Sequence, residues 1–290
     1  MGSRTMIGRA LALAGASVAL AGFASAPAMA STGAVSSVAK LVPASAKAKG
    51  LTVATDASYA PDEFVSGGKI TGMDVDLMNA LGKVMGLKVS IANVTFDDII
   101  PSMLSGRYAI GASSFTDNAT REKQVNFVDY ANVGESFYTL ASHGTNIKSI
   151  SNICGMTVSV ETGTTEQADA KTQSGKCVKA GKKAVTVSAF PNQNLANLAV
   201  SSGRAQLGFA DTPVASYQVK QSGGKFKLTG TAYAVSPYGI GVSKSSGLTN
   251  AVEAGMKYLV KHGTYAQIFK KWGLQSIEVP ASFVKIDGAK

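Results

Sequence analysis

The chain has 290 residues, of which 28 are lysine or arginine and 18 are aspartate or glutamate, giving a formal charge of +10. The basic residues are spread singly or in pairs and form no single face interleaved with aromatic residues, so a nucleic-acid partner is not expected. His143 and His262 are the two histidines, and neither has a cysteine or carboxylate at metal-ligand spacing, so we predict no metal and no other cofactor.

Residues 1–30 have the three parts of an export signal. Arg4 and Arg9 give a basic start, residues 10–24 form an apolar run, and residues 28–30 (Ala-Met-Ala) supply small side chains for cleavage. An apolar run of about 15 residues is shorter than the roughly 20 that a membrane-spanning helix needs, so a cleaved signal is preferred over a membrane anchor. We therefore predict a periplasmic or secreted protein.

The fold is expected to begin near residue 51, after a flexible leader over residues 31–49, which are rich in Ala, Ser, Val and Lys without periodicity. From there, β-rich runs alternate with apolar residues at helical spacing. The expected strands and helices are, in chain order, 51–55, 73–85, 88–94, 96–105 and 108–112. This alternation is typical of a mainly parallel sheet with right-handed crossovers.

The same alternation restarts in the second half of the chain. The expected elements there are a strand at 157–160, a helix after 165, a strand at 185–187, a helix at 195–200 and a strand at 206–210. A strand at 238–242 is expected to return the chain to the first sheet, followed by helices near 252–260 and 265–272. Roughly 260 residues after the signal leave room for two lobes with independent cores.

Ligands of open α/β sheets bind at the carboxyl ends of the strands, where the crossovers diverge. The residues directly after the expected strands are therefore the first candidates for a binding site. They are 56–59, 113–116, 161–166 and Asp211.

Side chains in this part of the sequence suit a free amino acid better than a catalytic reaction. Arg121 carries a cationic fork for a carboxylate, Asp211 can accept from an ammonium group, and Ser114 and Thr116 add neutral hydrogen bonds. Each charged residue also has a plain structural explanation, because Arg121 can face solvent on a helix and Asp211 can cap the helix that begins at Thr212. The chain lacks the Gly-x-Ser-x-Gly elbow and a phosphate loop, which weakens hydrolase and nucleotidase hypotheses.

Cys154 and Cys177 are the two cysteines of the chain. In an oxidising compartment we expect them to form a disulfide. The alternative is two separate buried thiols. It is weaker because Cys177 lies in a segment rich in Lys, Gly and Gln that should be exposed.

Several motifs in one order resemble those of the polar amino-acid-binding proteins of ABC importers, an extracellular solute-binding family. The resemblance extends over about 51–273. In the first half, the motifs are Thr-Asp-Ala-Ser-Tyr-Ala-Pro at 55–61, Gly-Met-Asp-Val-Asp-Leu at 72–77, the segment 96–106, and Ser-Phe-Thr at 114–116 followed by Arg121 and by Gln-Val-Asn-Phe at 124–127. In the second half, they are Gly-Thr-Thr at 163–165, the segment 203–211, Tyr-Gly-Ile at 238–240, Gly-Thr-Tyr at 263–265 and Lys-Trp-Gly at 271–273.

The resemblance implies a two-lobed periplasmic-binding-protein fold of type II, with two open α/β sheets joined by two hinge strands. It places lobe one at 50–133 and 238–290, lobe two at 137–232, and the hinge strands at 133–137 and 232–238. The implied protein is a monomer and not an enzyme. It captures a polar amino acid by hinge closure and delivers it to the membrane permease of an ABC transporter.

The resemblance also assigns roles to the residues at the strand ends. Arg121 with Thr116 would hold the ligand carboxylate, and Asp211 with Ser114 would hold its ammonium group. Tyr59 and Phe96 would enclose the ligand side chain, and Thr164 and Thr165 would present backbone N–H groups at a helix N-terminus. The remaining predicted ligand-binding residues are Asp56, Ser113 and Glu161.

Acidic residues near the expected pocket bear on selectivity. The family often has an aromatic residue directly after the proline of its first motif, but this chain has Asp62. Glu161, Glu166 and Asp62 would repel an acidic ligand inside a closed cleft, so we expect a basic or amide amino acid.

Two alternatives stay open. Some proteins similar to this family are secreted dehydratases of the cyclohexadienyl or arogenate type, and Glu161 or Glu166 could serve such an enzyme as a general acid. A receptor that feeds a signalling kinase would differ in its partner.

Overall fold

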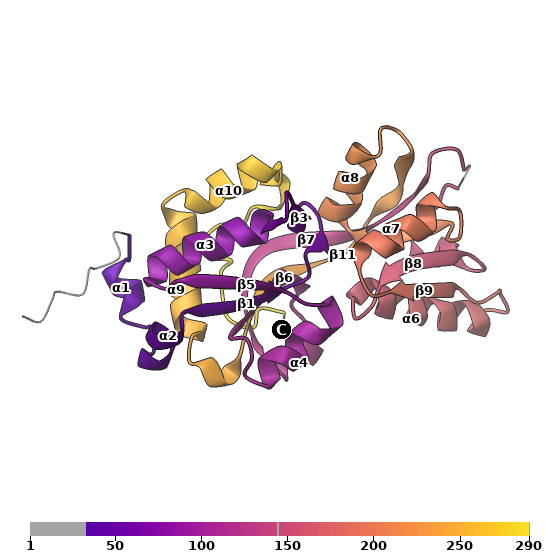
Figure 1. The fold of residues 1–290 in the computed structure, drawn as a ribbon. Coiled ribbons are helices and arrows are strands. Elements are labelled where there is room, and N and C mark those ends of the chain that lie inside the picture. The colour runs from indigo at the N-terminus through magenta and orange to yellow at the C-terminus, as the bar shows by residue number, and fades with distance from the viewer. Residues whose placement is uncertain (1–32, 144, 290) are drawn as a thin grey trace, which may run out of the picture. The chain divides into compact units, whose positions relative to one another are not determined.

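The computed structural model describes residues 33–143 and 145–289 (Figure 1). The predicted export signal at residues 1–30 lies outside the described residues. No helix of the described ranges is both long enough and apolar enough to cross a bilayer.

The large sheet has eight strands in the order β5-β1-β6-β11-β7-β10-β8-β9. A group of parallel strands lies at each end of this sheet. The first half contains β1 (Leu51–Thr55), β5 (Val89–Asn93) and β6 (Ile110–Thr116), with β1 central and parallel to both neighbours. The second half contains β8 (Thr157–Glu161), β9 (Thr186–Phe190) and β10 (Leu207–Asp211), with β8 central and parallel to both neighbours. These are the strands expected from the alternating pattern.

Two long strands join the halves (Figure 1). β7 (Asn126–Leu140) and β11 (Phe226–Val242) pair antiparallel along their length, while β11 also pairs with β6 and β7 with β10. The register between them shifts repeatedly from Thr229 to Gly239. This irregular stretch covers the predicted hinge at 232–238, whose bounds stay a prediction.

Helices cover both halves at the places that the apolar periodicity predicts. In α3 (Met73–Met85), Met73, Leu77, Leu81 and Met85 recur every four residues and are buried. The helix ends where Gly86 takes the left-handed conformation at φ 72°. The other helices are α4 (Phe96–Leu104), α5 (Ala119–Glu122), α6 (Thr165–Lys179), α7 (Gln193–Ser201), α8 (Thr212–Gln221), α9 (Thr249–Lys261) and α10 (Thr264–Trp272). Helices α3, α9 and α10 pack together over the core of the first half.

The N-terminal segment differs from the expected flexible leader. It forms α1 (Ser36–Ala39) and α2 (Ala44–Lys49), and Val38 and Val42 are 3% and 4% exposed within the core of the first half. Val35 N–H also donates to the carbonyl of Val84 at 2.9 Å. The two helices are so short that they show little periodicity. Helix α1 packs against α3 and α9, and α2 contributes Ala46 to the core of the first half.

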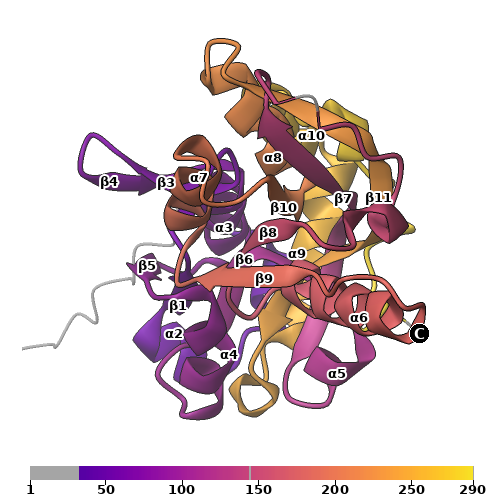
Figure 2. The ribbon, with the colours of Figure 1, turned by 90° about the vertical axis from the view of Figure 1, so that its right-hand side faces the viewer.

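A small antiparallel sheet, which the sequence did not predict, follows β1. It consists of β2 (Ser58–Tyr59), β3 (Glu63–Ser66) and β4 (Lys69–Thr71) in the order β2-β3-β4. We call residues 58–71 the hairpin sheet. It lies beside α7 (Figure 2), with which β2 is in contact.

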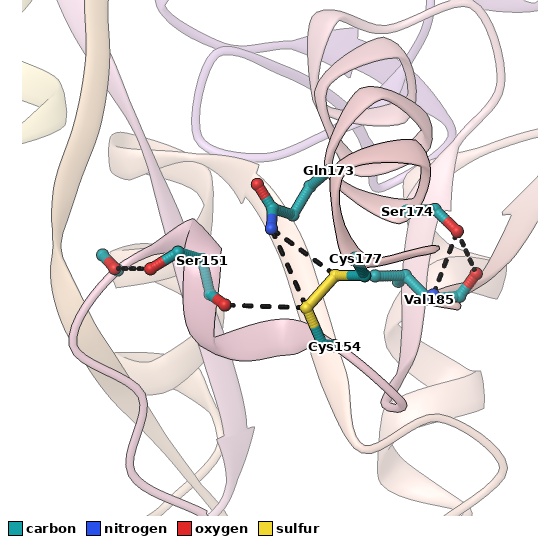
Figure 3. Close-up of a disulfide and its surroundings, with 7 residues drawn as sticks. Ser151, Cys154, Gln173, Ser174, Cys177 and Val185 are labelled. Atoms are coloured by element: carbon teal, nitrogen blue, oxygen red, sulfur yellow. Dashed lines mark hydrogen bonds between the residues drawn. A yellow bond between two sulfur atoms is a disulfide. The ribbon is translucent and has the colours of Figure 1, made fainter. Parts of the chain in front are cut away.

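The predicted disulfide between Cys154 and Cys177 is confirmed (Figure 3). It joins the residue after the short helix η1 (Ile150–Ile153) to the last turn of α6, with the two Cα atoms 5.6 Å apart. Gln173, one turn earlier on α6, donates its Nε2–H to Sγ of Cys177 at 3.5 Å. The short helices η2 (Lys244–Ser246) and η3 (Gln275–Ile277) complete the described elements.

Candidate functional site

A cavity lies at the carboxyl ends of the parallel strands, between the two halves, and its empty space is about 290 Å³ with the adjoining open solvent included. All of the predicted ligand-binding residues line it, and Glu166 joins them. The lining residues are Asp56, Tyr59, Phe96, Ser113, Ser114, Thr116, Arg121, Glu161, Thr164, Thr165, Glu166 and Asp211.

Arg121 is buried and does not face solvent. Asn118 caps α5 by accepting hydrogen bonds from the N–H groups of Thr120 and Arg121, which fixes the start of the Arg121 side chain. The guanidinium donates to the carbonyl of Thr116 at 2.7 Å and to that of Gly163 at 3.1 Å. The alternative of a solvent-facing arginine is therefore wrong for this structure.

The Arg121 guanidinium lies against aromatic rings instead of a carboxylate. Its Cζ is 5.3 Å from the ring centre of Phe96 and 5.2 Å from that of Phe115. Neither ion pair found among the described residues involves Arg121. A buried cation without an anionic partner is costly, and a ligand carboxylate would supply that partner.

Asp211 does not cap α8. It is the residue before the helix, but its side chain makes no hydrogen bond to the helix N-terminus. Its Oδ2 accepts from the Tyr59 hydroxyl at 2.9 Å, and the Tyr59 oxygen accepts from Asp211 N–H at 3.1 Å. Burial raises the pKa of Asp211 to about 6, although Tyr59 and Arg121 act in the opposite direction. The carboxylate is thus oriented toward the cavity and the other half, and the capping explanation is not realised.

Residues of β1 and β6 hold the cavity wall of the first half. Asp56 Oδ2 accepts from Phe96 N–H at 3.1 Å at the start of α4, and Ser113 Oγ accepts from Asp56 N–H at 2.9 Å. Ser114 has a positive φ of 47°, which is unusual for serine. Asp74 holds this conformation by accepting from Ser114 N–H at 2.8 Å. The polar groups are therefore fixed by a second layer of hydrogen bonds.

The N-terminus of α6 forms the opposite wall. Thr164 caps it by accepting from Gln167 N–H at 3.2 Å, and the Thr164 hydroxyl donates to the Glu161 carbonyl at 2.8 Å. Thr165 Oγ1 lies 3.3 Å from Thr116 Oγ1 across the cavity. A helix N-terminus of this kind favours an anionic group nearby.

Carboxylates outnumber cations in the lining. Asp56, Glu161, Glu166 and Asp211 face a single arginine. Burial holds the pKa of Glu161 well above its usual range, and Asp56 adds to this shift. Burial also holds the pKa of Glu166 well above its usual range, and Asp211 adds to that shift. One oxygen of Glu161 and one of Glu166 are buried without a hydrogen-bond partner among the described residues. Without a ligand, Glu161 and Glu166 therefore favour the protonated form. A cationic ligand would favour their ionised form, so the cavity is suited to a ligand with more positive than negative charge.

Glu135 on β7 is an acidic neighbour that the sequence analysis missed. It is 4% exposed, and burial with the nearby Asp211 raises its pKa to about 9. No local pattern marks it, because it lies in the middle of a long strand. No group of three or more His, Cys, Asp or Glu side chains suited to a metal ion occurs within residues 33–143 and 145–289.

A model of the bacterial extracellular solute-binding proteins, family 3, matches residues 51–275. The chain belongs to this family. The arginine-binding protein ArgT of Corynebacterium glutamicum is 33% identical to this family 3 protein over 244 residues, which are 83% of this chain and 80% of ArgT. The recognition and the functional class inferred from the motifs are thereby confirmed.

Solved structures of family 3 relatives confirm the type II periplasmic-binding-protein fold. An ancestral arginine-binding protein bound to arginine has a TM-score of 0.71 and 33% identity, covering 77% of this chain and 97% of that protein. An ancestral amino-acid-binding protein described as a precursor of cyclohexadienyl dehydratase has a TM-score of 0.69 and 31% identity, covering 79% and 97%.

Proposed function

We propose that this family 3 protein captures a free amino acid with a cationic side chain and delivers it to an ABC transporter permease. The observation that carries the proposal is the charge of the cavity. One buried arginine, which takes part in neither ion pair of the described residues, lies among four acidic side chains, whose ionised form a cationic ligand would favour.

The α-carboxylate and α-ammonium groups of an amino acid would pair with two of these side chains. The ligand carboxylate pairs with Arg121, supported by Thr116 and the N-terminus of α6. The ligand ammonium pairs with Asp211, with the Ser114 hydroxyl as a further acceptor. This arrangement uses the one cation of the lining and one of its four carboxylates.

The remaining carboxylates favour a second positive charge on the ligand. Asp56 and Glu161 are neighbours at the ends of β1 and β8. Repulsion from Asp56 adds to the raised pKa of Glu161, whereas a hydrogen bond with Glu161 lowers the pKa of Asp56. A guanidinium or ammonium group would relieve that repulsion and occupy the free oxygen of Glu161. Tyr59 and Phe96 supply aromatic faces that also attract a cation. The arginine-binding relatives support this assignment.

Closure of the two halves is part of the proposal. Lobe one comprises 50–133 and 238–290, lobe two comprises 137–232, and the hinges are the strand segments at 133–137 and 232–238. The hydrogen bonds of Tyr59 to Asp211 and of Arg121 to Gly163 cross between these lobes at the cavity. The protein would act as a monomer outside the cytoplasm.

Competition calorimetry with arginine, lysine, histidine, glutamine and glutamate tests the ligand class. We expect arginine or lysine to bind best and glutamate worst. The Glu161→Gln variant should reduce the preference for arginine over glutamine by about tenfold or more, because a hydrogen bond to a charged group is lost. Glu253→Gln, on α9 and not among the lining residues, is the matched control. Tightest binding of glutamate by the wild type would refute the proposal.

A dehydratase on the same fold is the second candidate. The raised pKa values of Glu161 and Glu166 favour protonated carboxyls, which a general acid requires. We propose that the protein nevertheless releases its ligand unchanged. NMR spectra of bound amino acids and of cyclic amino-acid precursors, recorded over hours, distinguish the two, since any turnover would establish an enzyme.

A further inference from the structure

The hairpin sheet contacts the second half at two points outside the cavity lining. Ser58 Oγ accepts from Gln193 N–H at 3.1 Å, and the ring centre of Phe64 lies 6.2 Å from that of Tyr217 on α8. The halves are joined covalently through β7 and β11 alone, which contain none of these residues. Both contacts therefore depend on the two halves being close together.

Phe64 is held in place from its own half. Its ring meets Trp272 edge-on at 5.9 Å and 87°, and the Trp272 Nε1–H donates to Asp76 Oδ2 at 2.8 Å. The backbone of Phe64 lies between Ser58 on β2 and Thr71 on β4. The ring is thus preorganised to meet Tyr217, so little side-chain entropy is lost when that contact forms.

Tyr217 is linked to the cavity through one rigid element. Helix α8 begins at Thr212, directly after Asp211, and Tyr217 lies on it less than two turns later. A motion that brings Asp211 to Tyr59 therefore also brings Tyr217 to Phe64. Phe64, Tyr217 and Trp272 are not among the residues that line the cavity.

We propose that Phe64 and Tyr217 form a latch that stabilises the closed arrangement and so sets ligand affinity without touching the ligand. The latch rests on the proposed function, because it requires closure around a ligand. A contact made only in the closed form raises the closed population, and the apparent affinity rises by the same factor for every ligand. An aromatic pair of this kind is worth roughly a two- to tenfold change.

The test compares Tyr217→Ala and Phe64→Ala with Val65→Ala, a control that replaces an exposed residue of the same strand. Calorimetry and stopped-flow dissociation are measured with arginine, lysine and histidine. Each latch variant should weaken all ligands that bind by one common factor, about two- to tenfold, through faster dissociation. The double variant should lose less than the two single losses combined.

Unchanged affinity in both latch variants, or losses that differ from ligand to ligand, overturns the latch. The melting temperature of ligand-free Tyr217→Ala identifies any general loss of folding, which the latch does not predict. A wild type that binds none of these amino acids refutes the proposed function instead. In that case the latch fails with it, because it requires closure around a ligand, whereas unchanged affinity in the variants beside a binding wild type overturns the latch alone.

Discussion

At the scale of single residues, Arg121 combines burial, charge and the absence of a carboxylate partner within the described chain. Its two hydrogen bonds to carbonyls fix the guanidinium, and neither ion pair of the described residues includes it. Arginine cannot lose its proton in a protein, so the charge persists despite burial. A buried charge of this kind lowers the free energy of unfolding of the ligand-free protein. Binding of an anion offsets this cost.

We expect Arg121→Ala to weaken amino-acid binding about 100-fold or more, because the ligand carboxylate would be buried without a cation. The ligand-free variant should melt at or above the wild-type temperature, since a desolvated charge has been removed. Arg107→Ala replaces an exposed arginine outside the cavity and should bind as the wild type does. Calorimetry and thermal melting check both, and ligand-induced stabilisation that survives in Arg121→Ala would contradict the assigned role.

Asp211 offers a second substitution that separates binding from stability. Asp211→Asn keeps the shape but removes the charge, so we expect affinity to fall about 100-fold. The ligand-free protein should lose little stability, because the Asp211 side chain caps no helix. Asp98→Asn, an exposed carboxylate in the first turn of α4, is the control. A large fall in melting temperature with unchanged affinity would restore the capping explanation.

At the scale of elements, α6 connects the cavity to the disulfide. Its N-terminus presents Thr164, Thr165 and Glu166 to the cavity, while its last turn carries Cys177. The crosslink anchors this end to the segment around η1 (Figure 3). The element is thus fixed at the end where no ligand contact occurs.

Replacing both cysteines with serine should lower the free energy of unfolding by about 3 kcal/mol, because the crosslink restricts the unfolded chain. The two cysteines are 23 positions apart, which sets the size of the closed loop. Urea denaturation of the wild type, with and without reductant, and of the double variant measures the change. Ligand affinity should stay within about twofold, which corresponds to about 0.4 kcal/mol. The reason is that the disulfide lies at the end of α6 opposite to its cavity-lining residues. Equal denaturation midpoints would contradict the prediction.

At the scale of the whole molecule, buried acids make the folded protein take up protons. Burial raises the pKa of Asp129 to about 8, with Asp117 adding to the shift, and that of Glu135 to about 9. The pKa of Asp211 rises to about 6. In an unfolded chain these groups titrate near pH 4. Their contribution to stability is therefore complete below about pH 4 and is lost as the pH rises through 6, 8 and 9.

The ligand-free protein should accordingly melt at a higher temperature near pH 5 than near pH 8.5. Glu135→Gln should reduce this difference, because glutamine resembles the protonated carboxyl at every pH. Melting curves across this range measure the effect. A wild type whose stability rises steadily with pH would contradict the prediction.

The sequence by itself determined the order of elements and the location of the site. Apolar periodicity predicted α3 and the strands β1, β8 and β10, because it reflects which side of each element is buried. The strand ends then predicted most of the residues that line the cavity, since parallel strands of a sheet end at one edge. Arg121 was predicted from its charge, and Phe96 from the family resemblance. The disulfide was predicted because the chain has two cysteines and was expected to be exported.

Only the tertiary structure decided what these residues do to one another. Solvent-facing and buried positions of Arg121 are equally compatible with the local sequence, and the choice depends on Gly163, 42 positions away. The Asp211 side chain does not cap α8 but accepts a hydrogen bond from Tyr59, which is 152 positions away. Glu135 and the packed helices α1 and α2 were missed for the same reason. Local patterns depend on neighbours along the chain, whereas burial, charge pairing and pKa depend on distant segments brought together by folding.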